Sequence, residues 1–152
     1  MIDKNTFKKT IATSLKTVGF VKKGGQSWYL QGKDSVIVFN LQKSNWDETY
    51  YINIGIWLKA LGESLFPLHN HCHLTYRVES LFPKQRELII NSCSLEKSNI
   101  KHLNNLSMFI ESQLAPFLQE CTNEKRLKEL FSQGDLENGL VNLVARQHLS
   151  DQ

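Results

Sequence analysis

Three features that would point to a class of protein are scarce in this sequence of 152 residues: cysteine, charge of one sign and long apolar runs. Its cysteines, Cys72, Cys93 and Cys121, are odd in number and widely spaced, which excludes a secreted disulfide framework and fits a reducing cytoplasm. No apolar run approaches the roughly 20 residues of a membrane span. The first residues, MIDKNTFKK, lack the apolar stretch of a signal peptide. We therefore expect a cytoplasmic protein without a membrane partner.

The net charge of +3 is small for a protein dedicated to nucleic acid. Positive charge is concentrated before residue 26, where Asp3 is the only acidic residue. We interpret the lysines there as the solvated face of a first helix, with weak phosphate binding as the alternative. These lysines are Lys4, Lys8, Lys9, Lys16, Lys22 and Lys23. Nucleic acid is therefore not an expected partner.

Motifs of known enzymes are also missing. No serine or cysteine stands in a nucleophile-elbow context, and Gly24-Gly25 lacks the Lys-Ser/Thr pair that completes a phosphate loop. Gln42 and Lys43 are adjacent on a predicted strand, so they point to opposite faces, whereas metal-dependent nucleases place such residues two apart. The sequence favours a role other than catalysis and indicates no cofactor.

The length favours one domain over residues 1–152, in which a helix and a sheet (1–83) share a core with a mostly helical part (84–152). Hydrophobic residues at 41% and charged residues at 22% are ordinary values for a globular protein. In the first part, Phe7, Ile11 and Leu15 recur at helical spacing, with Asp3 or Asn5 as cap and Gly19 after the end. Strand-like runs follow at 27–31, 35–43, 49–60 and 71–80.

The short turns between these runs predict an antiparallel meander. After Pro83, residues 84–94 fit a short strand or helix. A long helix begins near Glu96 and is interrupted around Pro116. Two further helices are predicted at 122–134, capped by Thr122 and ended by Gly134, and at 135–149, capped by Asp135. The fold class is α+β: an N-terminal helix packed on a four-stranded, mainly antiparallel sheet, followed by about three helices.

The two faces of the predicted sheet differ in chemistry, because strand side chains alternate. One face is apolar and should contact the first helix; the fourth strand contributes Cys72, Leu74, Tyr76 and Val78 to it. Amides, aromatic rings and a guanidinium group gather on the other face, and this mixture is typical of recognition surfaces. That candidate binding surface consists of Asn40, Gln42, Tyr51, Asn53, Trp57, His73, Thr75 and Arg77. The alternatives are a merely solvated face and a face covered by the C-terminal helices.

The segment PLHNHCHLTYRV groups three histidines and a cysteine. On a strand, His71 and His73 would point the same way and could share a zinc ion, whereas Cys72 would point to the opposite face. A third ligand would have to come from His69, from His102 or His148, or from a carboxylate. We favour no metal, with His69 and His71 in a loop and His73 as an ordinary sheet residue. The alternative is a metal-dependent hydrolase or nuclease built around His71 and His73.

The segments LKTVGFVKKGGQSWYL, VIVFNLQKSNWDETYYINIGIWL and CHLTYRVESLFP resemble bacterial domain-of-unknown-function family 4304. The resemblance covers roughly residues 7–83. It draws attention to Gln42, Lys43, Asn53, Cys72, His73 and Arg77 without assigning them a role. It implies small bacterial proteins with no established activity. We expect a protein-binding module that uses the polar sheet face, with immunity-like binding of a toxin as one form; the sequence leaves the partner and the oligomeric state open.

Overall fold

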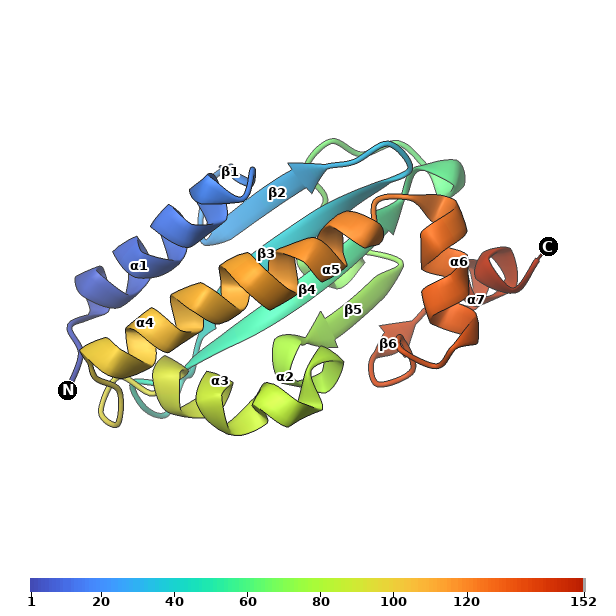
Figure 1. Cartoon of the computed structure of the whole chain (residues 1–152). Helices are drawn as coiled ribbons and strands as arrows, with labels where there is room; N and C mark the ends of the chain where they lie inside the picture. The colour runs from blue at the N-terminus through green and yellow to red at the C-terminus, as the bar shows by residue number, and fades with distance from the viewer. Residues whose placement is uncertain (152) are drawn as a thin grey trace.

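The computed structural model describes residues 1–151 and confirms an α+β architecture. Six strands form one antiparallel sheet in the order β1-β2-β3-β4-β5-β6, and helices cover one of its faces (Figure 1). The expectation of four strands was two too few, because the sheet also has a strand of only two residues at each edge. The strands are β1 (Val21–Lys22), β2 (Ser27–Gln31), β3 (Ser35–Lys43), β4 (Tyr50–Leu58), β5 (Leu74–Arg77) and β6 (Leu140–Val141).

The long central pair, β3 and β4, fixes the register of the sheet. Asn40 lies opposite Asn53 and Gln42 lies opposite Tyr51. On the next strand, Arg77 lies opposite Asn53. Directly opposed residues share a face, so these side chains all project from the side that carries no long helix.

Helix α1 (Lys4–Thr17) packs on the apolar face of the sheet through its predicted stripe. Phe7, Ile11 and Leu15 are buried, and the Phe7 ring contacts the Tyr50 ring of β4 with their centroids 5.1 Å apart. The side chain of Asp3 caps the helix by accepting a hydrogen bond from the Asn5 amide. The predicted helix is thus confirmed, with Asp3 as its cap.

A second long helical segment lies beside α1 on the same face (Figure 1). It consists of α4 (Ile100–Phe109), the π-helical turn η4 (Ile110–Leu114) and α5 (Ala115–Glu120). The interruption predicted around Pro116 is the π-helical turn just before it. Proline has no N–H for the helix and crowds the carbonyl four residues earlier, so the wider turn relieves this strain.

The remaining helices are short, and several differ from the expectation. They are η1 (Lys59–Leu61), η2 (His69–His71), α2 (Val78–Leu81), η3 (Pro83–Gln85), α3 (Arg86–Cys93), α6 (Glu124–Ser132) and α7 (Leu143–Ser150). The strand expected at 71–80 is restricted to β5, with η2 before it and α2 after it. The helix expected at 135–149 was wrong in its first half, where the chain forms β6, and Asn142 rather than Asp135 caps α7.

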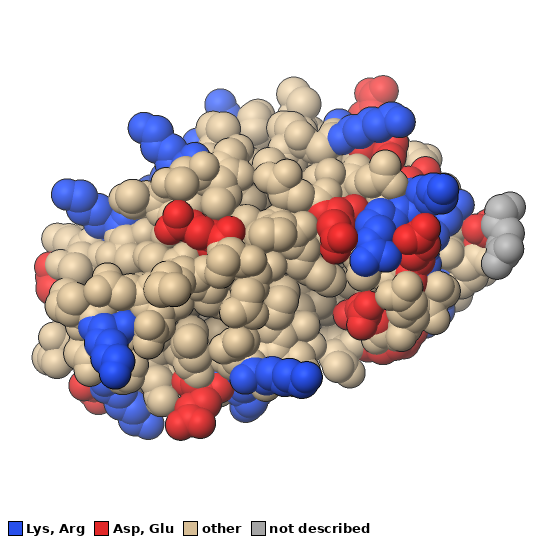
Figure 2. Space-filling view, in the orientation of Figure 1, with Lys and Arg blue, Asp and Glu red and all other residues tan. Residues whose placement is uncertain are grey.

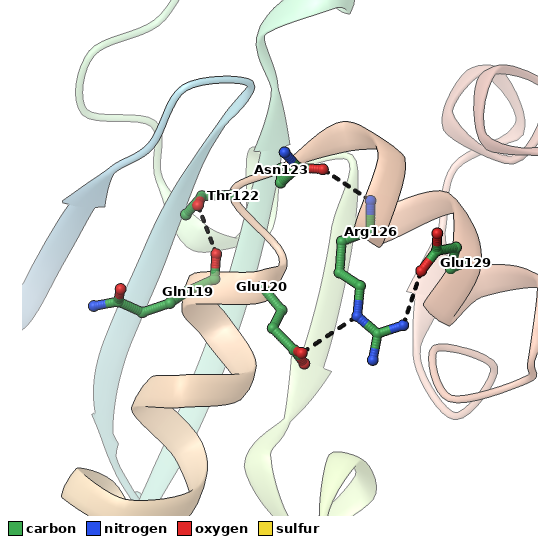
Figure 3. Close-up of polar contacts among 6 residues, drawn as sticks. All are labelled: Gln119, Glu120, Thr122, Asn123, Arg126 and Glu129. Carbon is green, nitrogen blue, oxygen red and sulfur yellow. Dashed lines mark hydrogen bonds and ion pairs between the residues drawn. The ribbon is translucent and has the colours of Figure 1, made fainter.

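The cap of α6 also needs correction. Asn123 accepts a hydrogen bond from the Arg126 amide at 2.9 Å, whereas the Thr122 hydroxyl donates to the carbonyl of Gln119 (Figure 3). The Arg126 guanidinium then joins α5 to α6 by contacting Glu120 and Glu129. Polar contacts of several residues therefore hold the junction between α5 and α6, and the identity of the capping residue alone does not predict them.

The main core lies between the sheet and the helical layer. It includes side chains from Ile2 to Leu149, among them the buried Phe39, Ile54 and Leu118. Charged side chains of both signs are interspersed on the helical face, and its centre is largely uncharged (Figure 2). Within residues 1–151, no helix combines the length and the apolar character needed to cross a bilayer.

Candidate functional site

The sheet face opposite the long helices is divided into a covered half and an open half. The covered half lies under the segment 59–73 and forms a small second apolar cluster, in which Trp57 packs against Tyr29, Val36, Val38 and Cys72. The open half carries the amides, Tyr51 and Arg77. The alternative in which the C-terminal helices cover this face does not describe the structure, because the connection between β4 and β5 covers part of it.

Trp57 and His73 belong to the covered half. The Trp57 indole N–H donates to the carbonyl of Gly62 at 2.9 Å, which ties the segment 59–73 to the sheet. His73 is 8% exposed, its ring lies 4.4 Å from that of Trp57, and its Nδ1 accepts a hydrogen bond from the amide of Leu58. Burial, and then the nearby charge of His148, lowers the pKa of His73. Both side chains therefore hold the covering segment in place.

The open half begins with a row of amides on β3 and β4 that is hydrogen-bonded to a serine on β2. Asn53 is buried and donates to Asn40 Oδ1 and to Gln42 Oε1, both at 3.0 Å. Asn40 donates in turn to the hydroxyl of Ser27 at 3.0 Å. A hydrogen-bonded network of this kind fixes the orientation of each amide. The row thus presents Gln42, which is exposed, in a defined position.

Arg77 stands at the end of this row, on β5. Its guanidinium carbon lies 4.1 Å from the centroid of the Tyr51 ring, close enough for a cation–π interaction. Its Nη1 is buried and has no hydrogen-bond partner among residues 1–151. A buried donor left in this state costs about 1–3 kcal/mol. The ion pairs within residues 1–151 do not include Arg77.

Arg77 lines a hollow of about 400 Å³, which we call the Arg77 hollow. Its floor is the sheet, one wall is η2, and the other wall is the segment before and within β6. The side chains that line it include Gln42, Asn53, Thr75 and Arg77 from the sheet, His69 and Asn70 from η2, and Asn138, Gly139 and Leu140 from the C-terminal wall. Its volume lies within the range of binding sites for small molecules or for a few side chains.

The charge in the Arg77 hollow is positive. No carboxylate is present among the described residues that line it. Burial, and then the positive charges of Arg77 and His71, lowers the pKa of His69, so His69 favours its neutral form. The hollow thus offers one permanent positive charge surrounded by neutral polar groups.

The structure does not assemble the histidine cluster into a metal centre. His69 and His71 lie on the 3-10 turn η2, whereas His73 is buried under Trp57 with its Nδ1 already engaged. Within residues 1–151, no three side chains of His, Cys, Asp or Glu are grouped so that they could hold a metal ion. The residues present therefore do not fit a zinc site.

The placement of Cys72 corrects the sequence interpretation. It was expected on the core face with Leu74, but it packs on the opposite face because the backbone bends between η2 and β5. A Cβ atom added to Gly55 would lie 2.8 Å from the Cys72 sulfur, which shows how closely they approach. Burial raises the pKa of Cys72, Cys93 and Cys121 to about 12, so these thiols are poor nucleophiles.

Sequence reasoning placed the sheet residues of the site on one face but missed its walls. Register brings Asn40, Gln42, Tyr51, Asn53, Thr75 and Arg77 together, while Trp57 and His73 are separated from them under the covering segment. The wall formed by residues 138–140 was missed because it was assigned to a helix. For the other wall, η2, one signal was available: Gly55 interrupts an apolar strand, and glycine there often marks the close approach of another segment.

The fold and the hollow define a class: an α+β domain with a polar, positively charged site on the open half of its sheet. The chain matches the family described as Domain of unknown function (DUF4304) over residues 11–120, and it belongs to this family. The match covers strands β1 to β5 and the long helical segment from α4 to α5, so it extends well beyond the segments that carried the resemblance. No curated protein and no solved structure matches the chain.

Proposed function

We propose that this protein is a protein-binding module and that the open half of its sheet face contacts the partner. The observation that carries the proposal is the Arg77 hollow, where an arginine stacked on Tyr51 has no acidic partner among residues 1–151. Arginine and tyrosine are enriched at the energetic centres of protein interfaces. An arginine held this way is available to a partner without first breaking an internal ion pair.

The surroundings of the hollow support a protein partner over a free small molecule. Leu140 lines the hollow and is 77% exposed, and Leu68, next to His69 on the opposite wall, is 56% exposed. Exposed apolar side chains beside a polar centre are typical of surfaces that another protein covers.

In its immunity-like form, this proposal expects the partner to be a toxic protein that loses its activity when bound. The support is the same surface, so this form differs from general binding only in its consequence for the partner. An assay of the partner's own activity, with and without one equivalent of this protein, would distinguish the two.

The test is isolation of the complex. The protein, carrying a tag without histidine, is expressed in its own host, purified gently at low salt and weighed by native mass spectrometry. We expect a second polypeptide bound to the wild-type protein and to Arg146→Gln, and largely absent from Arg77→Gln. Arg146 serves as the control because its guanidinium also lies over an aromatic ring, that of Phe131, but outside the hollow; unlike Arg77, it also pairs with Glu137 at 3.8 Å.

Three results bear on the proposal. Loss of the partner from Arg77→Gln alone, with the circular dichroism spectrum unchanged, would support the open half as the interface. Equal retention by all three proteins would reject it. Repeated recovery of a bare monomer from the wild-type protein would count against a binding module.

A further inference from the structure

The chemistry of the Arg77 hollow defines what it recognises. We infer that it takes the side-chain carboxylate of a glutamate or aspartate that projects from the partner protein. This inference rests on the proposed function, since it names the group that the same surface contacts.

The first argument is charge. Arg77 provides a permanent positive charge, and no carboxylate is present among the described residues that line the hollow. Glu48 pairs with Lys43 at 3.7 Å. Glu79, two residues from Arg77, forms no ion pair with it, although the buried Oε1 of Glu79 has no hydrogen-bond partner among residues 1–151. A partner carboxylate would therefore supply a counter-ion that the described residues do not.

The second argument is geometry. The guanidinium lies 4.1 Å from the centroid of the Tyr51 ring, and this contact restricts the orientation of its plane. A guanidinium with a fixed plane presents parallel N–H groups that match the two oxygens of a carboxylate. The Nη1 donor of Arg77 has no partner among residues 1–151, so a carboxylate that enters the hollow would give it an acceptor.

The third argument separates a carboxylate from a phosphate. The polar groups that line the hollow with Arg77 include neutral amides, such as those of Asn70 and Asn138, and the hydroxyls of Thr75 and Ser80. One positive charge among neutral donors balances a singly charged carboxylate, whereas phosphate sites commonly combine several cations or a series of backbone amides. Leu140 on the rim adds apolar surface that can contact the methylene groups of an acidic side chain.

The test uses a tripeptide that is acetylated and amidated, so that a central glutamate is its sole carboxylate, and a matched peptide with glutamine. Each is titrated into isotopically labelled protein while the backbone amides of Asn53, Thr75 and Arg77 and the Arg77 side-chain N–H are followed by nuclear magnetic resonance. We expect millimolar binding of the glutamate peptide at these signals and binding at least about tenfold weaker for the glutamine peptide. Arg77→Gln should abolish the response, Arg77→Lys should weaken it, and Arg146→Gln should leave it unchanged.

The inference is overturned if both peptides bind equally, if the shifts lie away from the hollow, or if inorganic phosphate binds there more tightly than the glutamate peptide. Should Arg77→Gln fail to fold, the comparison of the two peptides on the wild-type protein still decides the question. Failure of the inference differs from failure of the proposed function. If a partner binds through the open half and its affinity does not change when its own carboxylates are removed, the inference alone is wrong. If the glutamate peptide binds in the hollow but no partner protein binds at this face, the proposed function alone is wrong.

Discussion

Substitution of Gly55 by alanine tests how the covering segment packs on the sheet. A Cβ atom at this position would lie 2.8 Å from the Cys72 sulfur, 3.0 Å from the His69 carbonyl oxygen and 3.1 Å from the His69 Cα. The sulfur can move, but the backbone of His69 is held because the Cys72 and Trp57 side chains beside it are packed. The new methyl group must therefore push η2 away from the sheet.

The size of the effect follows from two opposing contributions. Overpacking of this kind costs about 1–3 kcal/mol, and replacing a glycine within a strand recovers roughly 0.5–1 kcal/mol. Because two of the three close contacts are with backbone atoms, we expect a net loss near the upper end, about 2 kcal/mol. In a chain of this length, that loss lowers the melting temperature by roughly 4–8 °C.

The assay is urea denaturation of four proteins: wild type, Gly55→Ala, Cys72→Ala and the double variant. Removing the Cys72 sulfur relieves the closest contact but not those with His69, so the double variant should be more stable than additivity predicts by about 0.5–1 kcal/mol. A loss below about 0.5 kcal/mol for Gly55→Ala, or additivity within about 0.3 kcal/mol, would refute the packing described here.

Three further substitutions test other parts of the structure. His73→Asn keeps an acceptor for the Leu58 amide but removes the titrating imidazole. Burial lowers the pKa of His73 in the folded protein below the usual value of about 6.5, so the unfolded protein binds more protons at mildly acidic pH. As the pH falls from about 7.5 toward about 5.5, the wild-type protein should therefore lose more unfolding free energy than the variant. Asn123→Ala removes the cap of α6 and should cost about 1 kcal/mol in urea denaturation, whereas Asn123→Asp should cost little. Gly139→Ala places a methyl group against the Tyr76 ring and should both destabilise the protein and shift the amide signals of the Arg77 hollow; an unchanged spectrum would contradict the position of that wall.

The central strands could be predicted from sequence because their patterns are strong. The bounds of β2 and β3 were predicted to the residue, and those of β4 to within two residues. Alternation along β3 and β4 then placed Asn40 with Asn53 on one face without any knowledge of the helices. The side on which Arg77 projects followed from the same alternation in β5, even though that strand was predicted too long.

The walls of the site could not be predicted because they depend on tertiary contacts. The segment 59–73 has no apolar period, and it covers the sheet because Trp57, Cys72 and His73 find partners there. Residues 135–149 contain apolar spacings that suit a helix, but β6 pairs with Leu74 and Thr75 instead. Two paired residues form no pattern that periodicity can detect.

The most direct test of the proposed function is the dissociation constant of the purified partner, measured by calorimetry against wild type, Arg77→Gln and Arg146→Gln. A central arginine anchor predicts weakening of about tenfold or more for Arg77→Gln. Arg146→Gln should bind as the wild-type protein does. Equal dissociation constants for all three proteins would contradict the assignment of the open half of the sheet as the binding surface.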